Sequence, residues 1–333
     1  MPLKPLAAAC TLAATAFLCH ASDTLRHAYT QPTARWPAPW IDPGVDFTEL
    51  APAPIAAPLT RAQRRQAVQG QRIFFDRRLS ATGTIACADC HRPGQGWTVN
   101  TPLAPGQAGQ GGRRNPPALH TAAARRHWGW DGAGTSLARR SLVPLADPAE
   151  MGPVSLGEAE ARAIGEALAA YQRTLDSPTR LDRFLRGDAA ALSDQQIHGL
   201  HLFRTKARCI NCHHGPLLTD ERFHNLGISS FGERSQDLGR FDATGRCEDA
   251  GAFRTPSLRH VARTAPYMHS GLFRTLEGVI HLYTRGGGEV RARNAREAAH
   301  PLFPCASRLS PHIRPLALTA EEAAALRAFL LAL

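Results

Sequence analysis

The sequence has few features of a membrane protein or of a β-rich protein. Beyond residue 21, no stretch approaches the roughly eighteen uncharged apolar residues of a membrane-spanning helix, so we expect no membrane span. No segment of useful length alternates apolar and polar residues as a half-buried strand does. Methionine is also scarce, with three residues in 333. These absences favour a mainly helical protein, and the length suits two domains.

Residues 1–21 have the features of a secretory signal peptide. Lys4 supplies positive charge, residues 5–19 are apolar but too short to cross a bilayer, and Ala21 is a small residue suited to cleavage. The sequence therefore predicts export, and we expect a periplasmic protein. Residues 22–59 are rich in proline and alanine and have no helical period, so they are predicted to form an extended arm or a linker.

The pattern Cys-x-x-Cys-His occurs twice. It comprises Cys87, Cys90 and His91 in the first half, and Cys209, Cys212 and His213 in the second. In this pattern the two thiols attach covalently to the vinyl groups of one haem, and the histidine binds the iron. The sequence therefore predicts two covalently bound haem c groups. A zinc site could use the same cysteine spacing, and a dithiol redox pair would not need the histidine.

Two further cysteines, Cys247 and Cys305, remain after export and haem attachment have been taken into account. In an oxidising compartment such a leftover pair suggests a disulfide bond. The alternative is two buried thiols.

The chain is strongly basic. Its formal net charge is +11, and arginine far outnumbers lysine. No nucleic-acid-binding motif accompanies this charge, so we expect no nucleic-acid partner. Haem propionates would pair with several arginines. The remaining ones suit docking to an acidic redox partner, or they reflect only an arginine-rich composition.

Two segments repeat the same helical pattern before a haem motif. In the first half, a capping box at 60–63 precedes Gly-x-x-aliphatic-Phe at 70–74. In the second half, a capping box at 193–196 precedes the same pattern at 199–203. This internal repeat indicates two similar haem-carrying helical units.

Two other helices are expected, and together with the repeat they suggest the domain organisation. A capping box at 155–158 predicts a helix with the apolar stripe Ile164, Leu168, Tyr171 and Leu175. A further capped helix at 319–330 closes the chain. We therefore predict a mainly α protein with two cytochrome c-like haem domains in one chain, at residues 60–188 and 189–333.

Longer motifs surround both haem sites. In the second half they are CINCHHGPLLTDERFHNLGI (209–228), FRTPSLRHVARTAPYMHSG (253–271), TLEGVIHLYTRGG (275–287) and LTAEEAAALRAFL (318–330). In the first half they are FFDRRLSATGTIACADCH (74–91), RNPPALH (114–120), WDGAGTSL (130–137) and PLADPAEMG (144–152). Over about residues 61–333 the chain resembles the bacterial di-haem cytochrome c peroxidase and MauG family. The resemblance implies that the N-terminal haem meets peroxide and the C-terminal haem passes electrons.

The resemblance implies residues for the peroxide site. Trp130 matches a tryptophan between the two haems, with Trp128 as a nearby competitor. Glu150, twenty residues later, matches a distal acid that moves a proton between the peroxide oxygens. Where the family usually has glutamine stands Arg140, which could stabilise the leaving oxygen, turn outward or pair with a propionate. Gln107 replaces a blocking histidine, so we predict an open sixth coordination site that needs no reductive activation.

For the second haem, the resemblance implies a sixth ligand fourteen residues after His269, which is Tyr283. MauG-type members use tyrosine and other peroxidases tend to use methionine. The scarcity of methionine supports Tyr283, because Met268 lies inside the PYMH motif, while His281 is a rival on another face of the helix. A tyrosine ligand favours MauG-like oxidation of a partner. MauG also exposes a tryptophan two residues before its second haem motif, where this chain has Ala207.

The family also holds a calcium ion between its domains. Its protein ligands match Asn115, Thr264 and Pro266, the last two through backbone carbonyls. Oxygen ligands suit Ca²⁺, although these loop residues would otherwise be ordinary turn formers. The implied cofactors are therefore two haem c groups and calcium.

Together the motifs predict a periplasmic di-haem c-type peroxidase. Hydrogen peroxide is expected at the haem of His91, where Glu150 assists O–O cleavage. Through Trp130 and the haem of His213 and Tyr283, an external donor, expected to be a protein, is oxidised. The first alternative is a conventional cytochrome c peroxidase served by a small cytochrome or copper protein. A non-catalytic di-haem electron carrier and a zinc-binding structural protein are further alternatives, and a homodimer is compatible with the sequence.

Overall fold

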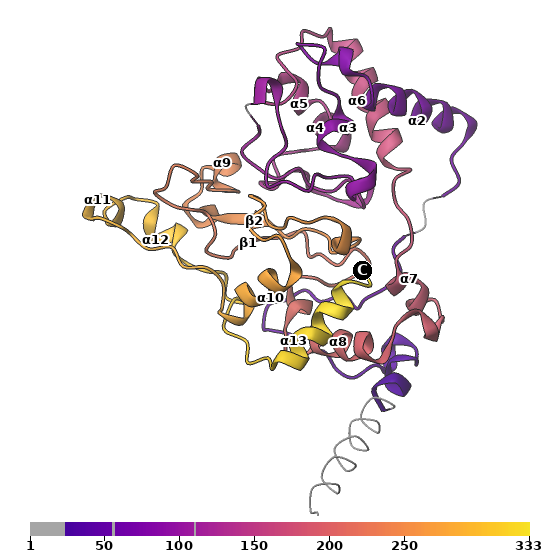
Figure 1. The fold of residues 1–333 in the computed structure, drawn as a ribbon, viewed down its shortest axis with the longest axis vertical. Coiled ribbons are helices and arrows are strands. Elements are labelled where there is room, and N and C mark those ends of the chain that lie inside the picture. The colour runs from indigo at the N-terminus through magenta and orange to yellow at the C-terminus, as the bar shows by residue number, and fades with distance from the viewer. Residues whose placement is uncertain (1–23, 55–56, 110) are drawn as a thin grey trace, which may run out of the picture.

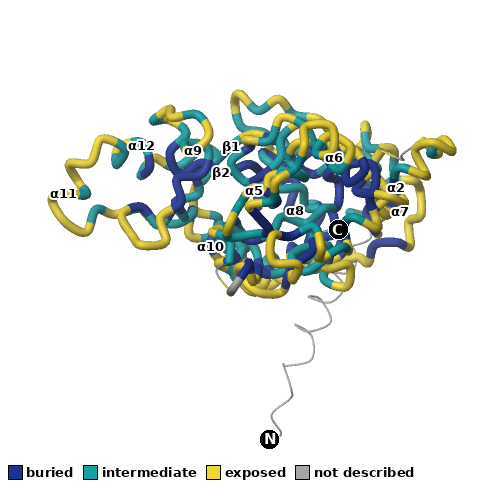
Figure 2. The backbone as a smooth tube through the Cα atoms, turned by 90° about the horizontal axis from the view of Figure 1, so that it is seen from above, coloured by how far each residue is buried: buried dark blue, intermediate teal, exposed yellow. Residues whose placement is uncertain are grey.

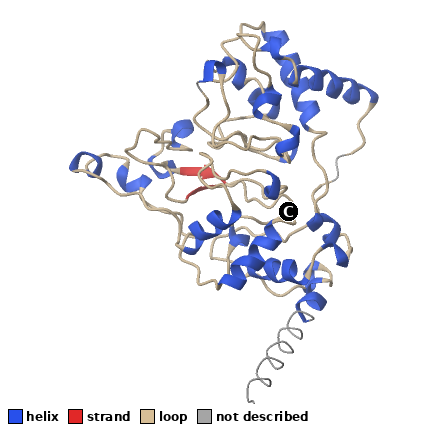
Figure 3. Cartoon of the chain, viewed as in Figure 1, coloured by secondary structure: helices blue, strands red, loops and turns tan. Residues whose placement is uncertain are grey.

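The computed structural model describes residues 24–54, 57–109 and 111–333, so the expected signal peptide lies outside the described residues. Figures 1 and 3 show a mainly helical chain in two halves, with a small lobe projecting from one side. The upper half contains α2 (Arg61–Phe74), α3 (Cys87–Cys90), α4 (Leu137–Arg140), α5 (Val143–Ala146) and α6 (Glu158–Gln172). The lower half contains α7 (Arg180–Leu185), α8 (Asp194–Arg204), α10 (Leu276–Thr284) and α13 (Ala320–Leu330). No helix of the described ranges is both long and apolar enough to cross a membrane.

The N-terminal half is built on a close crossing of α2 and α6. The predicted capping box begins α2. At Gly70 the backbones approach so closely that a Cβ atom would lie 1.9 Å from the carbonyl oxygen of Ala167. One turn later, Phe74 packs edge-on against Tyr171 with ring centroids 5.3 Å apart. Glycine thus permits the close approach, and the aromatic pair fills the space beside it.

Helix α6 supplies the predicted apolar stripe but begins differently from the prediction. Ile164, Leu168 and Tyr171 of the helix pack in one cluster with Phe74, and Leu175, three residues beyond the end of the helix, belongs to the same cluster. The stripe is thus confirmed. The predicted capping box at 155–158 is wrong, because the helix begins at Glu158 with Gly157 as N-cap and no side-chain cap. Ser155 lies two residues before the N-cap and is therefore not the capping residue.

Helices α8 and α13 repeat the crossing in the C-terminal half. A Cβ atom at Gly199 would lie 2.0 Å from the carbonyl oxygen of Ala325. One turn later, Phe203 packs edge-on against Phe329 with ring centroids 5.2 Å apart. Both predicted capping boxes, at the starts of α8 and α13, are present. The internal repeat is therefore confirmed down to the placement of its glycine and its aromatic residue.

The N-terminal arm, residues 24–54, packs into the core of the C-terminal half. Tyr29, Trp36 and Leu50 are buried there among residues of α8 and α13. Residues 24–29 are helical, although the sequence has no helical period. Leu25 and Tyr29, one turn apart, both contact this core, so tertiary packing stabilises a helix that would be too short alone.

A buried arginine ties the arm to the end of α8. Arg204 is 1% exposed. Its guanidinium donates to the carbonyl of Pro37 at 2.6 Å, to the hydroxyl of Tyr29 at 3.1 Å and to the carboxylate of Glu49. The positive charge of Arg204 is thus paired with a carboxylate, and its N–H groups donate hydrogen bonds, as the burial of an arginine requires. The arm is thus an integral part of the C-terminal half.

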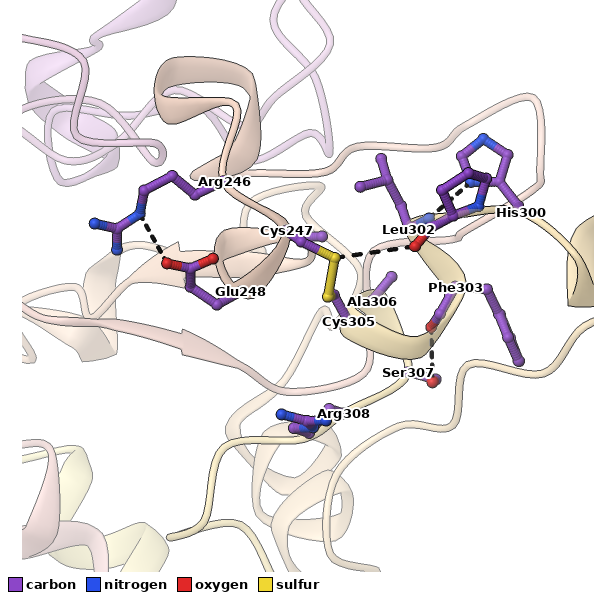
Figure 4. Close-up of a disulfide and its surroundings, with 12 residues drawn as sticks. Arg246, Cys247, Glu248, His300, Leu302, Phe303, Cys305, Ala306, Ser307 and Arg308 are labelled. Atoms are coloured by element: carbon purple, nitrogen blue, oxygen red, sulfur yellow. Dashed lines mark hydrogen bonds and ion pairs between the residues drawn. A yellow bond between two sulfur atoms is a disulfide. The ribbon is translucent and has the colours of Figure 1, made fainter.

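The lobe is held by a disulfide bond. One segment of the lobe connects two antiparallel strands, β1 (Phe223–Asn225) and β2 (Ala252–Arg254), and contains α9 (Phe241–Thr244). The other segment lies between α10 and α13 and contains α11 (Ala295–Ala298) and α12 (Phe303–Ala306). Cys247 and Cys305 are bonded with their Cα atoms 5.7 Å apart, which confirms the predicted pairing (Figure 4). The tip of the lobe around α11 is exposed (Figure 2). The lobe also has a small core of its own, in which Phe231, Leu238 and Ala306 are buried, and the covalent link adds to its stability.

Helix α7 connects the halves. The predicted boundary between residues 188 and 189 assigns Leu181 and Phe184 to the N-terminal domain. In the structure, both pack with the core of the C-terminal half. The carboxylate of Asp182 is buried with the guanidinium of Arg259 at 2.7 Å, and it accepts a second bond from the amide of Ala53. The domain boundary stays a prediction, but the packing of α7 favours an earlier position for it.

Candidate functional site

Each haem motif opens onto a cavity of its own. The N-terminal cavity has a volume of about 520 Å³ and the C-terminal cavity one of about 210 Å³. Their walls include Cys87, Cys90 and His91 in the first and Cys209, Cys212 and His213 in the second. Burial raises the pKa of all four thiols, so they stay protonated. Two thiols and one imidazole in a cavity wall are a donor set that fits covalently held haem.

The two histidines are oriented in the same way. Nδ1 of His91 lies 3.1 Å from the carbonyl oxygen of Trp97, and Nδ1 of His213 lies 3.0 Å from that of Leu218. A carbonyl can only accept, so each Nδ1 carries the proton and each Nε2 keeps its lone pair. Burial lowers the pKa of both imidazoles to about 4. Each is therefore neutral and pre-oriented as a metal-binding histidine is.

The zinc alternative fits this arrangement poorly. The two cysteine pairs open onto different cavities, so they do not form one four-cysteine site. In the described residues, one group of three potential ligands is close enough to share an ion: Cys212, Asp220 and His224. Nε2 of His224 is already 2.8 Å from the Asp220 carboxylate. A structural zinc needs four ligands, so the walls fit haem better.

Glu150 and Arg140 both line the N-terminal cavity. Burial raises the pKa of Glu150, and the positive charge of Arg140 opposes that rise. Arg140 is the last residue of α4, whereas its neighbour Arg139 is exposed and lies outside the lining. Of the three orientations open for Arg140, the outward one is therefore excluded. A carboxyl with a raised pKa can accept and return a proton at moderate pH.

Gln107 does not enter the N-terminal cavity. Its side chain is 7% exposed, and Nε2 donates to the carbonyl of Gly152 at 2.6 Å. His91 is the one histidine among the residues that line this cavity in the described chain. The arrangement agrees with an open sixth coordination site, which stays a prediction.

Tyr283 and His213 line the same cavity, and His281 does not. Although Tyr283 and His281 share α10, His281 is exposed. Burial raises the pKa of the Tyr283 phenol, and the nearby thiols raise it further. Met268 also lines the cavity, which the sequence did not indicate. Besides the phenol of Tyr283 and the thioether of Met268, the lining includes the imidazoles of His224, His269 and His312.

Trp130 lines both cavities, whereas Trp128 lines the N-terminal one. Nε1 of Trp130 donates to the carbonyl of Asn115 at 2.8 Å. The amide of Asn115 in turn donates to the carbonyl of His269, in the wall of the C-terminal cavity, at 2.6 Å. Trp128 donates to Ala122 within its own half. Of the two tryptophans, Trp130 has the position expected of a residue between two haems.

Two arginines of the C-terminal half hold the backbone around Trp130. The carbonyl of Gly129 accepts from Nε of Arg254 at 3.1 Å, and that of Trp130 accepts from the Arg254 amide at 2.8 Å. The carbonyl of Asp131 accepts from Arg240 at 2.8 Å. We call these two arginines and the carbonyls of residues 129–131 the tryptophan clamp. It fixes Trp130 from across the boundary between the halves.

The three candidate calcium ligands come together in the structure. Asn115, Thr264 and Pro266 all lie in the lining of the C-terminal cavity. Nδ2 of Asn115 donates to the carbonyls of Thr101 at 3.2 Å and Pro102 at 3.0 Å, which leaves Oδ1 as its acceptor atom. An amide oxygen and backbone carbonyls are ligands that Ca²⁺ takes. The calcium site stays a prediction.

The arm adds a carboxylate that sequence reasoning missed. Asp42 binds Arg208, Arg314 at 2.9 Å and Nδ1 of His312 at 3.1 Å, and all three partners line the C-terminal cavity. These partners hold the pKa of Asp42 below its usual range despite burial, which acts in the other direction. An aspartate in a proline-rich segment gives no sign of such a role. Arg254 and Met268 were missed because each is one residue inside a longer motif.

The chain is similar to known haem proteins. The sequence profile of the family described as di-haem cytochrome c peroxidase matches residues 64–162. "Cytochrome-c peroxidase IdrP1" of Denitromonas iodatirespirans is 32% identical, with 85% of each chain covered. "Methylamine utilization protein MauG" of Methylorubrum extorquens is 35% identical, with 72% of this chain and 73% of that protein covered. The similarity to both kinds of relative thus extends well beyond a single motif.

Solved structures give the same result. The crystal structure of a MauG-like protein associated with microbial copper homeostasis has a TM-score of 0.70 and 32% identity, with 87% of this chain and 94% of that chain covered. The diheme peroxidase BthA from Burkholderia thailandensis has a TM-score of 0.67 at 24% identity, covering 85% of this chain and 94% of that chain. The second likeness supports the fold alone.

Proposed function

The chain belongs to the di-haem cytochrome c peroxidase family, and we propose that it reduces hydrogen peroxide at its N-terminal site and oxidises a protein donor through its C-terminal site. Membership makes it an oxidoreductase with haem cofactors, but its relatives include both cytochrome c peroxidases and MauG. One observation favours the MauG kind. Tyr283, which stands at the ligand position implied by the MauG-type motif, lies in the wall of the cavity that contains His213.

Each cavity offers a complete set of residues for one haem. Cys87, Cys90 and His91 would hold the first, and Cys209, Cys212, His213 and Tyr283 would hold the second. Bound there, haem supplies the iron that reduces peroxide and passes electrons. The side chains around the cavities have three further tasks, which are to move protons, to carry electrons between the sites and to set the potential of the second site.

Glu150 moves the proton. Cleavage of the O–O bond requires a proton to pass from one peroxide oxygen to the other. The Glu150 carboxylate accepts that proton, and its carboxyl form returns it to the oxygen that leaves as water. The raised pKa of this group keeps both steps within reach at moderate pH. Arg140, in the same lining, supplies positive charge where negative charge develops on the leaving oxygen.

Trp130 lies where an electron has to cross between the two sites. Its side chain lines both cavities, and its indole N–H is bound to Asn115 rather than free to move. The tryptophan clamp fixes its backbone. An easily oxidised indole in a fixed position between the sites would support rapid electron exchange.

Tyr283 sets the potential of the second site. A phenolate ligand donates charge and stabilises oxidised iron, whereas a thioether favours reduced iron and raises the potential. With Tyr283 as ligand, the C-terminal site is suited to sharing oxidising equivalents rather than to storing an ordinary electron. This supports MauG-like oxidation of a protein donor.

A conventional cytochrome c peroxidase is the second candidate, and Met268 is the observation that favours it. Its thioether lies in the lining of the same cavity as Tyr283. With Met268 as ligand, the second site would accept electrons from a small cytochrome or copper protein. A non-catalytic electron carrier is less favoured, because it leaves Glu150 and Arg140 in the N-terminal cavity without a role.

Low-temperature EPR of the ferric, haem-loaded protein tests these assignments. We expect one high-spin and one low-spin haem, with the low-spin signal changed in Tyr283→Phe and unchanged in Met268→Leu. The reverse pattern in the two variants would establish the conventional peroxidase. Two low-spin haems in the unsubstituted protein would contradict the open peroxide site and favour the electron carrier.

We also propose a periplasmic location and a calcium ion. The segment 1–21 has the composition of a signal peptide, and the Cys247–Cys305 bond suits an oxidising compartment. The candidate calcium ligands are Asn115, Thr264 and Pro266. The net charge of +11 supports an acidic protein as the donor.

A further inference from the structure

Trp40, in the N-terminal arm, is the tryptophan that this protein exposes. All five tryptophans lie in the described residues, and Trp40 is 52% exposed, whereas Trp36 in the same arm is buried. The other three are partly buried. A large exposed indole loses hydrophobic stabilisation, and such residues are enriched where proteins contact partners. Its neighbours in the structure indicate what kind of contact this is.

The backbone of Trp40 is held against the second haem motif. Its amide donates to the carbonyl of Arg204, the last residue of α8, at 2.9 Å. Its carbonyl accepts from Nδ2 of Asn211 at 3.0 Å. Asn211 lies between Cys209 and Cys212 in the motif. Trp40 is therefore one hydrogen bond away from the short chain segment that attaches the second haem.

Asp42 fixes this part of the arm in place. Its amide donates to Oδ1 of Asn211 at 2.6 Å, so the Asn211 side chain bonds the arm with both of its polar atoms. The Asp42 carboxylate is bound by Arg208, Arg314 and His312. The arm runs beside α8 along the lower half of the molecule (Figure 1). Trp40 thus has a defined position at the surface over the haem motif.

Other groups near this motif are less accessible to a protein. Ala207, just before the motif, is 3% exposed and faces the C-terminal cavity. Tyr283 is also a lining residue of that cavity. Electron transfer slows steeply with distance, so a docked donor needs a surface group that is well coupled to the site. Trp40 is exposed, aromatic and bonded to the motif.

We propose that Trp40 is the surface residue through which a docked protein donor passes its electrons to the C-terminal site. The inference rests on the proposed function and adds the contact point for the donor. In each turnover, hydrogen peroxide takes up two electrons and two protons and becomes two molecules of water. Each electron leaves a reduced donor protein, which is thereby oxidised by one electron.

The relay step at Trp40 is a one-electron exchange. The oxidised C-terminal site takes one electron from the indole of Trp40, and the indole N–H proton passes to solvent. The donor then returns one electron to the indole, and solvent returns the proton. Trp40 ends unchanged, and two such exchanges balance one peroxide. The oxidant is the peroxide of the proposed reaction, so no further reagent is needed.

The test uses the haem-loaded protein mixed with peroxide in the absence of a donor. With ring-deuterated tryptophan incorporated, freeze-quench EPR should detect a tryptophan radical that disappears in Trp40→Phe. Mass spectrometry should find oxygen added to Trp40. Trp40→Tyr should give a tyrosyl radical instead. The matched control is Trp36→Phe, a buried tryptophan of the same arm, which should leave the radical unchanged.

A protein donor supplies a second readout. Reduced plastocyanin, an acidic blue copper protein, serves as the probe. We expect its peroxide-driven oxidation to fall on the order of tenfold in Trp40→Phe and to be restored in Trp40→Tyr. Because the bonds to Arg204 and Asn211 are made by the backbone, both variants should keep the arm in place.

The outcomes separate this inference from the proposed function. If the unsubstituted protein fails to consume peroxide even with a small organic donor, the proposed function is wrong. If it consumes peroxide, but Trp40→Phe keeps both the tryptophan radical and the rate with plastocyanin, Trp40 is not the relay and this inference alone is overturned.

Discussion

The two cavities attach their haem in the same way and differ in what surrounds it. In each, a pair of partly buried cysteines and a histidine held by a backbone carbonyl form one wall. The N-terminal cavity adds Glu150 and Arg140, and the C-terminal cavity adds Tyr283 and Met268. One half thus surrounds its haem with groups that handle protons and the other with groups that set a potential. The comparison teaches that the attachment motif predicts the cofactor, and the remaining lining predicts its task.

The largest effect is expected at the proton-handling group. Glu150→Gln keeps the size of the side chain but removes the base, so the rate of peroxide reduction should fall by about 10²–10⁴. Stopped-flow mixing with peroxide measures this rate. Glu158→Gln, at the exposed start of α6, is the matched control and should be unaffected. A Glu150→Gln variant that reacts at the original rate would mean that the two cavities do not differ in proton handling.

The next effect concerns the potential of the second site. Tyr283→Met replaces a phenolate by a thioether and should raise the reduction potential of the C-terminal haem by ~0.1 V, a fraction of the roughly 0.8 V that axial ligands span. That shift corresponds to between one and two factors of ten in a one-electron equilibrium. Spectroelectrochemical titration measures it, with the N-terminal haem as internal reference. No shift, or an equal shift of both haems, would contradict ligation by Tyr283.

The pH dependence of peroxide reduction should also reflect the proton-handling group that only the N-terminal cavity has. Burial raises the pKa of Glu150, so its carboxylate form is lost at a higher pH than for an exposed glutamate. Because the reaction needs the carboxylate, the rate should be full above this pKa and fall by about tenfold per pH unit below it. The pH profile of peroxide reduction measures this. A profile that is the same in Glu150→Gln would assign the titration to another group.

The smallest effect is expected at the tryptophan clamp, which links the two sites. Arg254→Lys removes the side-chain bond to Gly129 but keeps the backbone bond to Trp130, so electron exchange between the haems should slow by ~3–10-fold. Time-resolved absorbance of the C-terminal haem after peroxide is added measures it. Arg240→Met, which loses the bond to Asp131 and the cation–π contact with Phe223 but no bond to Gly129 or Trp130, should have a smaller effect. If neither variant changes the rate, the clamp does not position Trp130 for electron transfer.

Features encoded by short spacings could be predicted from the sequence. The haem motifs and the glycine and aromatic residue of each helix crossing depend on residues within one or two helical turns. Tyr283 came from the family motif, and its role as a ligand stays a prediction. The choice between Trp130 and Trp128 came from a family motif, and the structure adds that one lines both cavities. Local spacing decides which face of an element a residue occupies, and that is sufficient for these features.

Features that depend on distant chain segments could not be predicted. Arg204 reads as the charged end of a helix, yet it is buried because the arm, more than 150 residues earlier, supplies its partners. The prediction of a capping box at 155–158 was wrong. The residue types at these positions match the pattern, but the helix begins at Glu158, so Ser155 is too far from it to act as the cap. Met268 was set aside by counting methionines, and composition gives no information on which side chains enter a cavity.

The position of the arm has a consequence for the order in which the two halves can fold. The arm is made and delivered first among the described residues, yet Tyr29 and Leu50 bury against helices from the other end of the chain. The N-terminal half has its core helices α2 and α6 within one continuous stretch and can close early. The C-terminal half has to wait for α13, and contacts between such distant segments form slowly. Until then the arm lacks part of the core that holds it, so we expect the second haem motif to stay accessible for haem attachment until the arm packs against Asn211.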